Sequence, residues 1–148
     1  MPAPRLLQFL RDLELLVGGV DESAGHRRAL EVAGRFGFPA TAGVHPHEAR
    51  IADEAVYDEL RGLAREGRIV AIGEIGLDFH YDHSPRDSQR EAFRRQIRLA
   101  RDVGLPIVVH TREADEETAD ILEQEGAGEA GGVIHCFTGG LDLARRAL

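Results

Sequence analysis

Residues 68–77 read Arg-Ile-Val-Ala-Ile-Gly-Glu-Ile-Gly-Leu, an apolar run in which Glu74 is the only charged residue after Arg68. Apolar residues at successive positions are typical of a strand buried on both faces, because a half-exposed strand alternates apolar and polar side chains. The sequence therefore predicts a buried strand here. Similar runs, rich in Val, Ile and Leu, predict further strands at residues 13–20, 38–45, 105–111 and 132–138.

Longer amphipathic stretches separate these runs. In residues 84–103, Phe93, Ile97 and Ala100 are spaced by four and then three residues, which places them on one stripe of a helix. Strands that alternate with helices predict a parallel sheet with helices outside it, because parallel neighbours need crossover connections. The predicted helices are residues 22–35, 49–66, 84–103 and 114–124, a partial helix at 4–12, and a helix that opens at Leu141.

Two α/β folds fit this alternation, an open doubly wound sheet and a (β/α)₈ TIM barrel with strands in sequential order. No proline-rich linker or low-complexity tract divides the chain, so a single domain is expected over residues 1–148. A whole barrel needs about 250 residues. We therefore expect a partial barrel and an incomplete chain.

Composition and charge narrow the classes of function. The chain has 43% hydrophobic and 30% charged residues, which excludes a disordered tail. Its one cysteine, Cys136, excludes an intramolecular disulfide and Cys-based zinc motifs, and we expect a buried thiol. The net charge of −8 argues against a broad basic nucleic-acid surface, but not against an enzyme that reaches phosphates through metal ions. No segment resembles a membrane span or a secretory signal, so a cytoplasmic location with no membrane partner is expected.

Polar side chains follow the predicted strands at their carboxyl ends, the edge at which parallel α/β folds bind ligands. Glu74, His110 and His135 lie about one βα unit apart in the sequence, so neighbouring strands can bring them to one point. Imidazole and carboxylate together suit Zn²⁺ or Mn²⁺, and also Mg²⁺ when further oxygen ligands join. We predict that these three residues are metal ligands. The alternative is that each histidine only caps its strand.

Four more residues near this edge are candidates for contacting substrate or orienting the ligands: His45, His47, Asp78 and Arg112. We expect only one of His45 and His47 to point inward, which favours an indirect or phosphate-binding role over direct ligation, and a plain loop role is the alternative. Asp78 could orient a ligand histidine. Arg112 could bind a phosphate in a bidentate manner or pair with Glu113 or Glu116.

Five stretches, in order and with matched spacing, resemble the TatD family of metal-dependent deoxyribonucleases, which are metallo-dependent hydrolase barrels. They are GVHPH at 43–47, AIGEIGLD at 71–78, Gln89-x-x-x-Phe93-x-x-Gln96, LPIVVHTREA at 105–114 and GVIHCFTG at 132–139. The resemblance implies a (β/α)₈ barrel whose two-metal site hydrolyses phosphodiester bonds of DNA. It places the family's glutamate ligand at Glu74 and its two later histidine ligands at His110 and His135.

The chain also departs from the family pattern. The family's first strand ends in an H-x-H pair, and its last strand carries E-T-D, whose aspartate is a ligand and the expected general base. Nothing before Leu13 resembles that first strand, and no E-T-D follows, so the catalytic residue stays unknown and the resemblance implies truncation at both ends, to about strands 2–6 of 8. Unclosed barrel edges predict self-association.

The predicted function is therefore hydrolysis of phosphodiester bonds, with DNA as substrate and divalent Mg, Mn or Zn as cofactor, two ions per full-length site. An amidohydrolase or an aminoacyl-tRNA deacylase using the same site is an alternative, because such barrels host many hydrolyses. A catalytically inactive metal- or phosphate-binding fragment is another. A Ser-His-Asp hydrolase is disfavoured, because no G-x-S-x-G occurs, and P-loop nucleotide hydrolysis is excluded, because no G-x-x-x-x-G-K-[ST] occurs.

Overall fold

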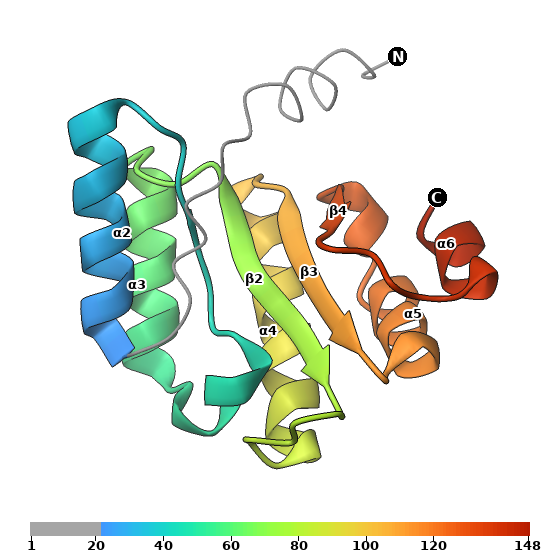
Figure 1. Cartoon of the computed structure of the whole chain (residues 1–148). Helices are drawn as coiled ribbons and strands as arrows, with labels where there is room; N and C mark the ends of the chain where they lie inside the picture. Colours follow the sequence, from blue (N-terminus) through green and yellow to red (C-terminus); the bar gives the residue numbers. More distant parts are fainter. Residues whose placement is uncertain (1–21) are drawn as a thin grey trace.

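The computed structural model describes residues 22–148, so the helix predicted at 4–12 and the strand predicted at 13–20 lie outside the described residues. Within residues 22–148, four parallel strands form one sheet in the order β1-β2-β3-β4 (Figure 1). A doubly wound sheet reverses its strand order at a switch point. The sequential order here is that of a barrel, and the α/β prediction is confirmed. The strands are β1 (Thr41–Ala42), β2 (Ala71–Asp78), β3 (Ile107–Arg112) and β4 (Gly132–Ile134).

Strand β2 lies between two neighbours and organises the sheet. It pairs with β1 at Thr41↔Ala71 and with β3 from Ile72↔Ile107 to Asp78↔Arg112. Its apolar side chains are fully buried, as the continuous apolar run predicts. The register with β3 shifts between Gly73 and Ile75, so Glu74 is an extra residue in β2 with no partner in the β3 register. Such bulges redirect a side chain and are common beside functional sites.

Helices cover the sheet as the alternation predicts, and α4 lies directly behind β2 and β3 (Figure 1). The stripe of Phe93, Ile97 and Ala100 on α4 is fully buried. The single helix predicted at 49–66 is instead two elements, because Pro46 starts a 3₁₀ helix and Asp53 caps a separate α-helix by accepting a hydrogen bond from Val56 N–H at 3.0 Å. The helices are α2 (Glu22–Phe36), α3 (Glu54–Arg65), α4 (Arg86–Val103), α5 (Asp115–Gln124) and α6 (Leu141–Ala147), with 3₁₀ helices η1 (Pro46–Ile51) and η2 (Ala127–Glu129).

The two outer strands are shorter than the predicted ranges 38–45 and 132–138. Strand β1 ends at Ala42, and a glutamine side chain from α4 then bonds the backbone of Val44. Strand β4 ends at Ile134, and Cys136 adopts a φ of +45°, which an extended strand does not allow. The thiol of Cys136 is consequently exposed, and the prediction of a buried thiol was wrong.

An apolar groove of about 580 Å³ lies beside β4, between α5 and α6, with Val133, Ile134 and Phe137 among its lining residues. The part of the chain that the structure describes contains no helix long and apolar enough to cross a membrane.

The predicted self-association through barrel edges stays a prediction. The oligomeric state measured at rising protein concentration tests it.

An ionic contact ties the end of α5 to α4. Glu125 is 8% exposed, and its carboxylate accepts hydrogen bonds from Arg94 Nη1 at 2.8 Å and from Arg98 Nε at 2.7 Å. The hydrogen bond from Arg98 lowers the pKa of Glu125, and this effect outweighs the opposing effect of burial. Because the pKa is lower in the folded state than in the unfolded chain, ionised Glu125 stabilises the fold.

We therefore expect Glu125→Gln to lower the free energy of unfolding by about 1 kcal/mol at pH 7. The stabilisation is complete above the unfolded pKa of 4.5 and is lost as the pH falls through the lower folded value. Urea denaturation at pH 7 and pH 3 measures this: the difference between wild type and Glu125→Gln should shrink at pH 3. Glu129→Gln, which removes an exposed partner of Arg101, is the control and should change stability less. An equal loss at both pH values would contradict the prediction.

Candidate metal centre

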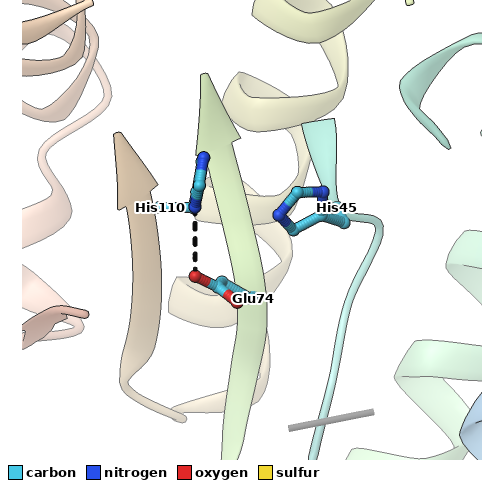
Figure 2. Close-up of side chains that lie close together, drawn as sticks. All are labelled: His45, Glu74 and His110. Carbon is cyan, nitrogen blue, oxygen red and sulfur yellow. Dashed lines mark hydrogen bonds and ion pairs between the residues drawn. The ribbon is translucent and has the colours of Figure 1, made fainter. Parts of the chain in front are cut away.

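Three side chains from consecutive segments of the sheet converge on one point: His45, Glu74 and His110 (Figure 2). His45 follows β1, Glu74 is in β2, and His110 is in β3. Each offers one nitrogen or oxygen atom, and these atoms all lie within 4.8 Å of one another. Among residues 22–148, these side chains meet the distance requirement for holding a single ion.

Glu74 owes its place to the bulge in β2, where the register shift leaves it outside the regular pairing. Its Oε1 atom lies 3.3 Å from Nδ1 of His110 and 3.2 Å from Nδ1 of His135. Burial raises the pKa of Glu74, but the hydrogen bond with His110 and the nearby histidine charges lower it more, so the net shift is downward. The carboxylate is ionised at neutral pH.

The structure places His135, the third predicted ligand, beside Glu74 and outside the three-residue cluster. Its backbone N–H donates to the carbonyl oxygen of Val109 at 2.8 Å, which continues the pairing of β3 with the chain beyond β4. Its ring is then linked to His110 only through the shared Glu74 oxygen. Glu74 is thus the central residue of the predicted ligand set.

Asp78 lies at the end of β2 and is fully buried. Its Oδ2 atom is 2.9 Å from Nε2 of His110 and 2.9 Å from Nε2 of His47. Its Oδ1 atom accepts hydrogen bonds from the backbone N–H groups of His80 and Tyr81. Burial raises the pKa of Asp78, but these hydrogen bonds together lower it to about 2. Asp78 is therefore ionised at neutral pH, and its carboxylate contacts the rings of His47 and His110.

The pKa values of His110 and His45 are shifted in opposite directions. Burial lowers the pKa of His110, but its contacts with the Glu74 and Asp78 carboxylates raise it above the ordinary value. For His45, burial, followed by the neighbouring His110 and His47, lowers the pKa to about 4. His45 is therefore neutral at pH 7, the form in which an imidazole can donate a nitrogen lone pair.

Both histidines of the His45-Pro46-His47 turn reach the site, and the prediction that only one would point inward was wrong. Residues two apart share a face even in an extended strand, and here the chain also turns at Pro46, where η1 begins, so nothing directs the two rings to opposite sides. His45 caps η1 by accepting a hydrogen bond at Nδ1 from His47 N–H at 3.2 Å. The two rings meet edge to face with centroids 4.4 Å apart.

Arg112 and a group of rings form the rim of the site. The Arg112 guanidinium lies 4.9 Å from the centroid of the Tyr81 ring, and Tyr81 stacks on His83 with ring planes 5° apart. Glu113, a predicted partner for Arg112, instead contacts Nδ1 of His80 at 2.7 Å. The predicted phosphate contact of Arg112 stays a prediction.

Sequence reasoning missed the part played by two glutamines of the quoted motif. Gln89 and Gln96 are fully buried on α4, where they bond the backbone of Asp78 and Val44. The available signal was their spacing: seven residues apart, they share a helix face with the apolar stripe that packs on the sheet. Buried polar side chains on such a face need partners, and the nearest are strand backbone groups.

Comparison with known proteins settles the family. The sequence model described as TatD related DNase matches residues 11–148. The chain belongs to the TatD family. Members of this family include metal-dependent hydrolases and nucleases, so the enzyme class expected from the resemblance is confirmed at the level of the family.

Two TatD-family relatives illustrate the extent of the match. The chain is 44% identical over 122 residues to "Uncharacterized metal-dependent hydrolase YabD" of Bacillus subtilis, covering 82% of this chain and 48% of that protein. It is 46% identical over 100 residues to "3'-5' ssDNA/RNA exonuclease TatD" of Rahnella sp., covering 68% of this chain and 38% of that protein. The chain thus spans at most about half the length of these TatD-family relatives.

A solved TatD-family structure has the same fold. The crystal structure of YjjV, a TatD homologue from Escherichia coli, superposes with a TM-score of 0.77 at 27% sequence identity. The match covers 86% of this chain and 50% of the YjjV chain. The four parallel strands therefore correspond to about half of a TatD-family structure.

We expect Asp78→Asn to lower the pKa of His110, because the substitution removes one of the two carboxylates that raise it. NMR titration of the imidazole signals of the metal-free protein measures the shift. Glu113→Gln, which removes a carboxylate from the His80 contact at the rim, is the matched control and should leave His110 unchanged. An unaltered His110 titration in Asp78→Asn would show that Asp78 does not determine its protonation.

Proposed function

We propose that this chain supplies metal-binding residues of a divalent-metal-dependent hydrolase that cleaves phosphodiester bonds in nucleic acid. The observation that carries the proposal is the convergence of His45, Glu74 and His110, with the Asp78 carboxylate against the far nitrogen of His110. Membership of the TatD family supports it independently.

The donor atoms suit a divalent cation. Two imidazoles and one carboxylate match the ligand preferences of Zn²⁺ and Mn²⁺, and Mg²⁺ would need further oxygen ligands. A ligand histidine normally donates its second N–H to a carboxylate, and Asp78 takes that place at Nε2 of His110. The Nδ1 side of the same ring faces Glu74. The residues proposed to hold metal are His45, Glu74, His110 and His135, in a full-length site that holds two ions.

A bound divalent cation would lower the pKa of a coordinated water and neutralise charge on a phosphate. The side chains of this chain prepare the site for that chemistry in two ways. Ionised Glu74 and Asp78 give it a negative charge that attracts a cation, while neutral His45 adds a donor without adding charge. A polyanionic substrate is repelled by these carboxylates in a chain of net charge −8, and a bound divalent cation would offset this repulsion.

We propose single-stranded DNA or RNA as the substrate. The Rahnella relative is named as an exonuclease acting on single-stranded DNA and RNA. The rim of this site combines the Arg112 cation with the stacked rings of Tyr81 and His83. Single-stranded nucleic acid is held by such combinations of cations for the backbone and rings for the bases. A cytoplasmic location completes the proposal, and the single free cysteine suits a reducing compartment.

Glu74→Gln tests the metal site. We expect wild-type chain to retain about one Mn²⁺ or Zn²⁺ per chain after dialysis, and the variant to bind at least about 10-fold more weakly, because it loses the only carboxylate of the cluster. Metal analysis and isothermal titration calorimetry measure this. Glu66→Gln, at an exposed position before β2, is the control and should retain the metal. A folded wild type that retains no ion would overturn the proposal.

The substrate is tested separately, with 5′-labelled single-stranded DNA, single-stranded RNA and an aminoacyl ester offered to the metal-loaded chain. Cleavage of the nucleic acids that is lost in Glu74→Gln supports the proposal. Hydrolysis of the ester alone would contradict the proposed substrate and would indicate that the site catalyses deacylation instead. Metal retention without any hydrolysis would show that this chain binds the ion and does not catalyse.

A further inference from the structure

Two fully buried glutamines, Gln89 and Gln96, lie seven residues apart on α4 and face the sheet. Each has an exposed fraction of 0%, and both share the buried face of α4 with the apolar side chains of Phe93, Ile97 and Ala100. A buried amide is costly unless its donors and acceptor are satisfied. Each glutamine bonds both the N–H and the carbonyl oxygen of one backbone residue. Gln96 bonds Val44 in this way, and Gln89 bonds Asp78.

Gln96 bonds the backbone of Val44, the residue before His45. Its Oε1 atom accepts a hydrogen bond from Val44 N–H at 2.6 Å, and its Nε2 atom donates to the Val44 carbonyl oxygen at 3.1 Å. Strand β1 has already ended at Ala42, so the amide takes over where pairing with β2 stops. The remaining Nε2 hydrogen is donated to the carbonyl oxygen of Ala92, within α4 itself.

Gln89 does the same for Asp78. Its Oε1 atom accepts from Asp78 N–H at 2.8 Å, and its Nε2 atom donates to the Asp78 carbonyl oxygen at 3.2 Å. Nε2 also donates to the carbonyl oxygen of Ser84 at 2.9 Å. The Ser84 hydroxyl in turn donates to the His47 carbonyl oxygen at 2.7 Å, so Gln89 is connected to η1 as well as to the end of β2.

We propose that Gln96 and Gln89 are positioning residues of the metal centre, an inference that rests on the proposed function. Gln96 sets the backbone from which His45 projects. Gln89 sets the backbone of Asp78, and Asp78 orients His110 through its contact with Nε2. One rigid helix thus fixes two segments that carry the site, although α4 contributes no side chain to the cluster itself.

Gln96→Met and Gln89→Met test the proposal, because methionine has a similar length and removes both backbone hydrogen bonds. We expect each variant to bind Mn²⁺ about 10-fold more weakly than wild type, the size of effect seen when a supporting partner of a metal ligand is lost. Calorimetric titration measures the affinity, and circular dichroism confirms that the variant is folded. Should Gln96→Met fail to fold, Gln96→Asn retracts the amide by one methylene group and tests the same contact.

Ile97→Ala is the matched control, because Ile97 is the next residue on α4 and is fully buried. It lowers stability by leaving a cavity but keeps both amides, so its Mn²⁺ affinity should equal that of wild type. If Ile97→Ala weakens Mn²⁺ binding as much as Gln96→Met does, the glutamines act only through general stability and the proposal is wrong.

A metal-free measurement separates this inference from the proposed function. We expect Gln96→Met to shift the imidazole NMR signals of His45, and Gln89→Met to shift those of His47 and His110, while Ile97→Ala leaves all three in place. Unchanged imidazole signals in both methionine variants would overturn the positioning role. Absence of Mn²⁺ binding in wild type, with the imidazole signals shifted as expected, would overturn the proposed function and leave the positioning role standing.

Discussion

The pairing of β2 with β3 is the constraint on which the site depends. Above the register shift, Gly76 pairs with His110 and adopts a φ of +142°, and a Cβ atom there would collide with the His110 carbonyl oxygen. Glycine is therefore required for the two backbones to approach. The same shift leaves Glu74 outside the regular pairing. A single irregularity in the central strand thus brings a carboxylate and an imidazole from neighbouring strands within 3.3 Å of one another.

Opposing effects of burial and of neighbouring charges set the protonation of the ionisable side chains that lie together at the metal centre. Glu74 and Asp78 remain ionised because histidines and backbone N–H groups compensate them, and burial is not enough to reverse this. His45 lies at the other extreme, held neutral by burial and by its histidine neighbours. The result is an anionic centre with a neutral donor beside it, which favours a divalent cation over a monovalent one because the attraction grows with the charge of the ion.

The sequence predicted the parallel α/β sheet, its sequential units and the apolar stripe of α4, because periodicity and burial follow directly from residue order. It predicted Glu74 and His110 as neighbours for the same reason. It did not predict the contacts of both His45 and His47 with the site, because these depend on the 3₁₀ turn that begins at Pro46. Nor did it predict the glutamine contacts, because the seven-residue spacing of Gln89 and Gln96 shows that they share the buried face of the helix but does not show which backbone groups they bond. The exposure of Cys136 depends on a positive φ that the sequence does not reveal.

Every strand pairing in the described sheet joins consecutive strands, and each crossover is local in the chain. Each parallel pairing still closes a loop the length of a helical crossover, as between Ile72 and Ile107, so β2, α4 and β3 gain their contacts only when they come together as one unit. That unit holds the fully buried side chains of β2 and α4, so we expect its amides to be the last to exchange with solvent. We expect the outer strands, with two and three residues, to open more readily. Glu74, His110 and Asp78 therefore belong to the most persistent part of the structure, and His45 and His135 to its more readily opened margins.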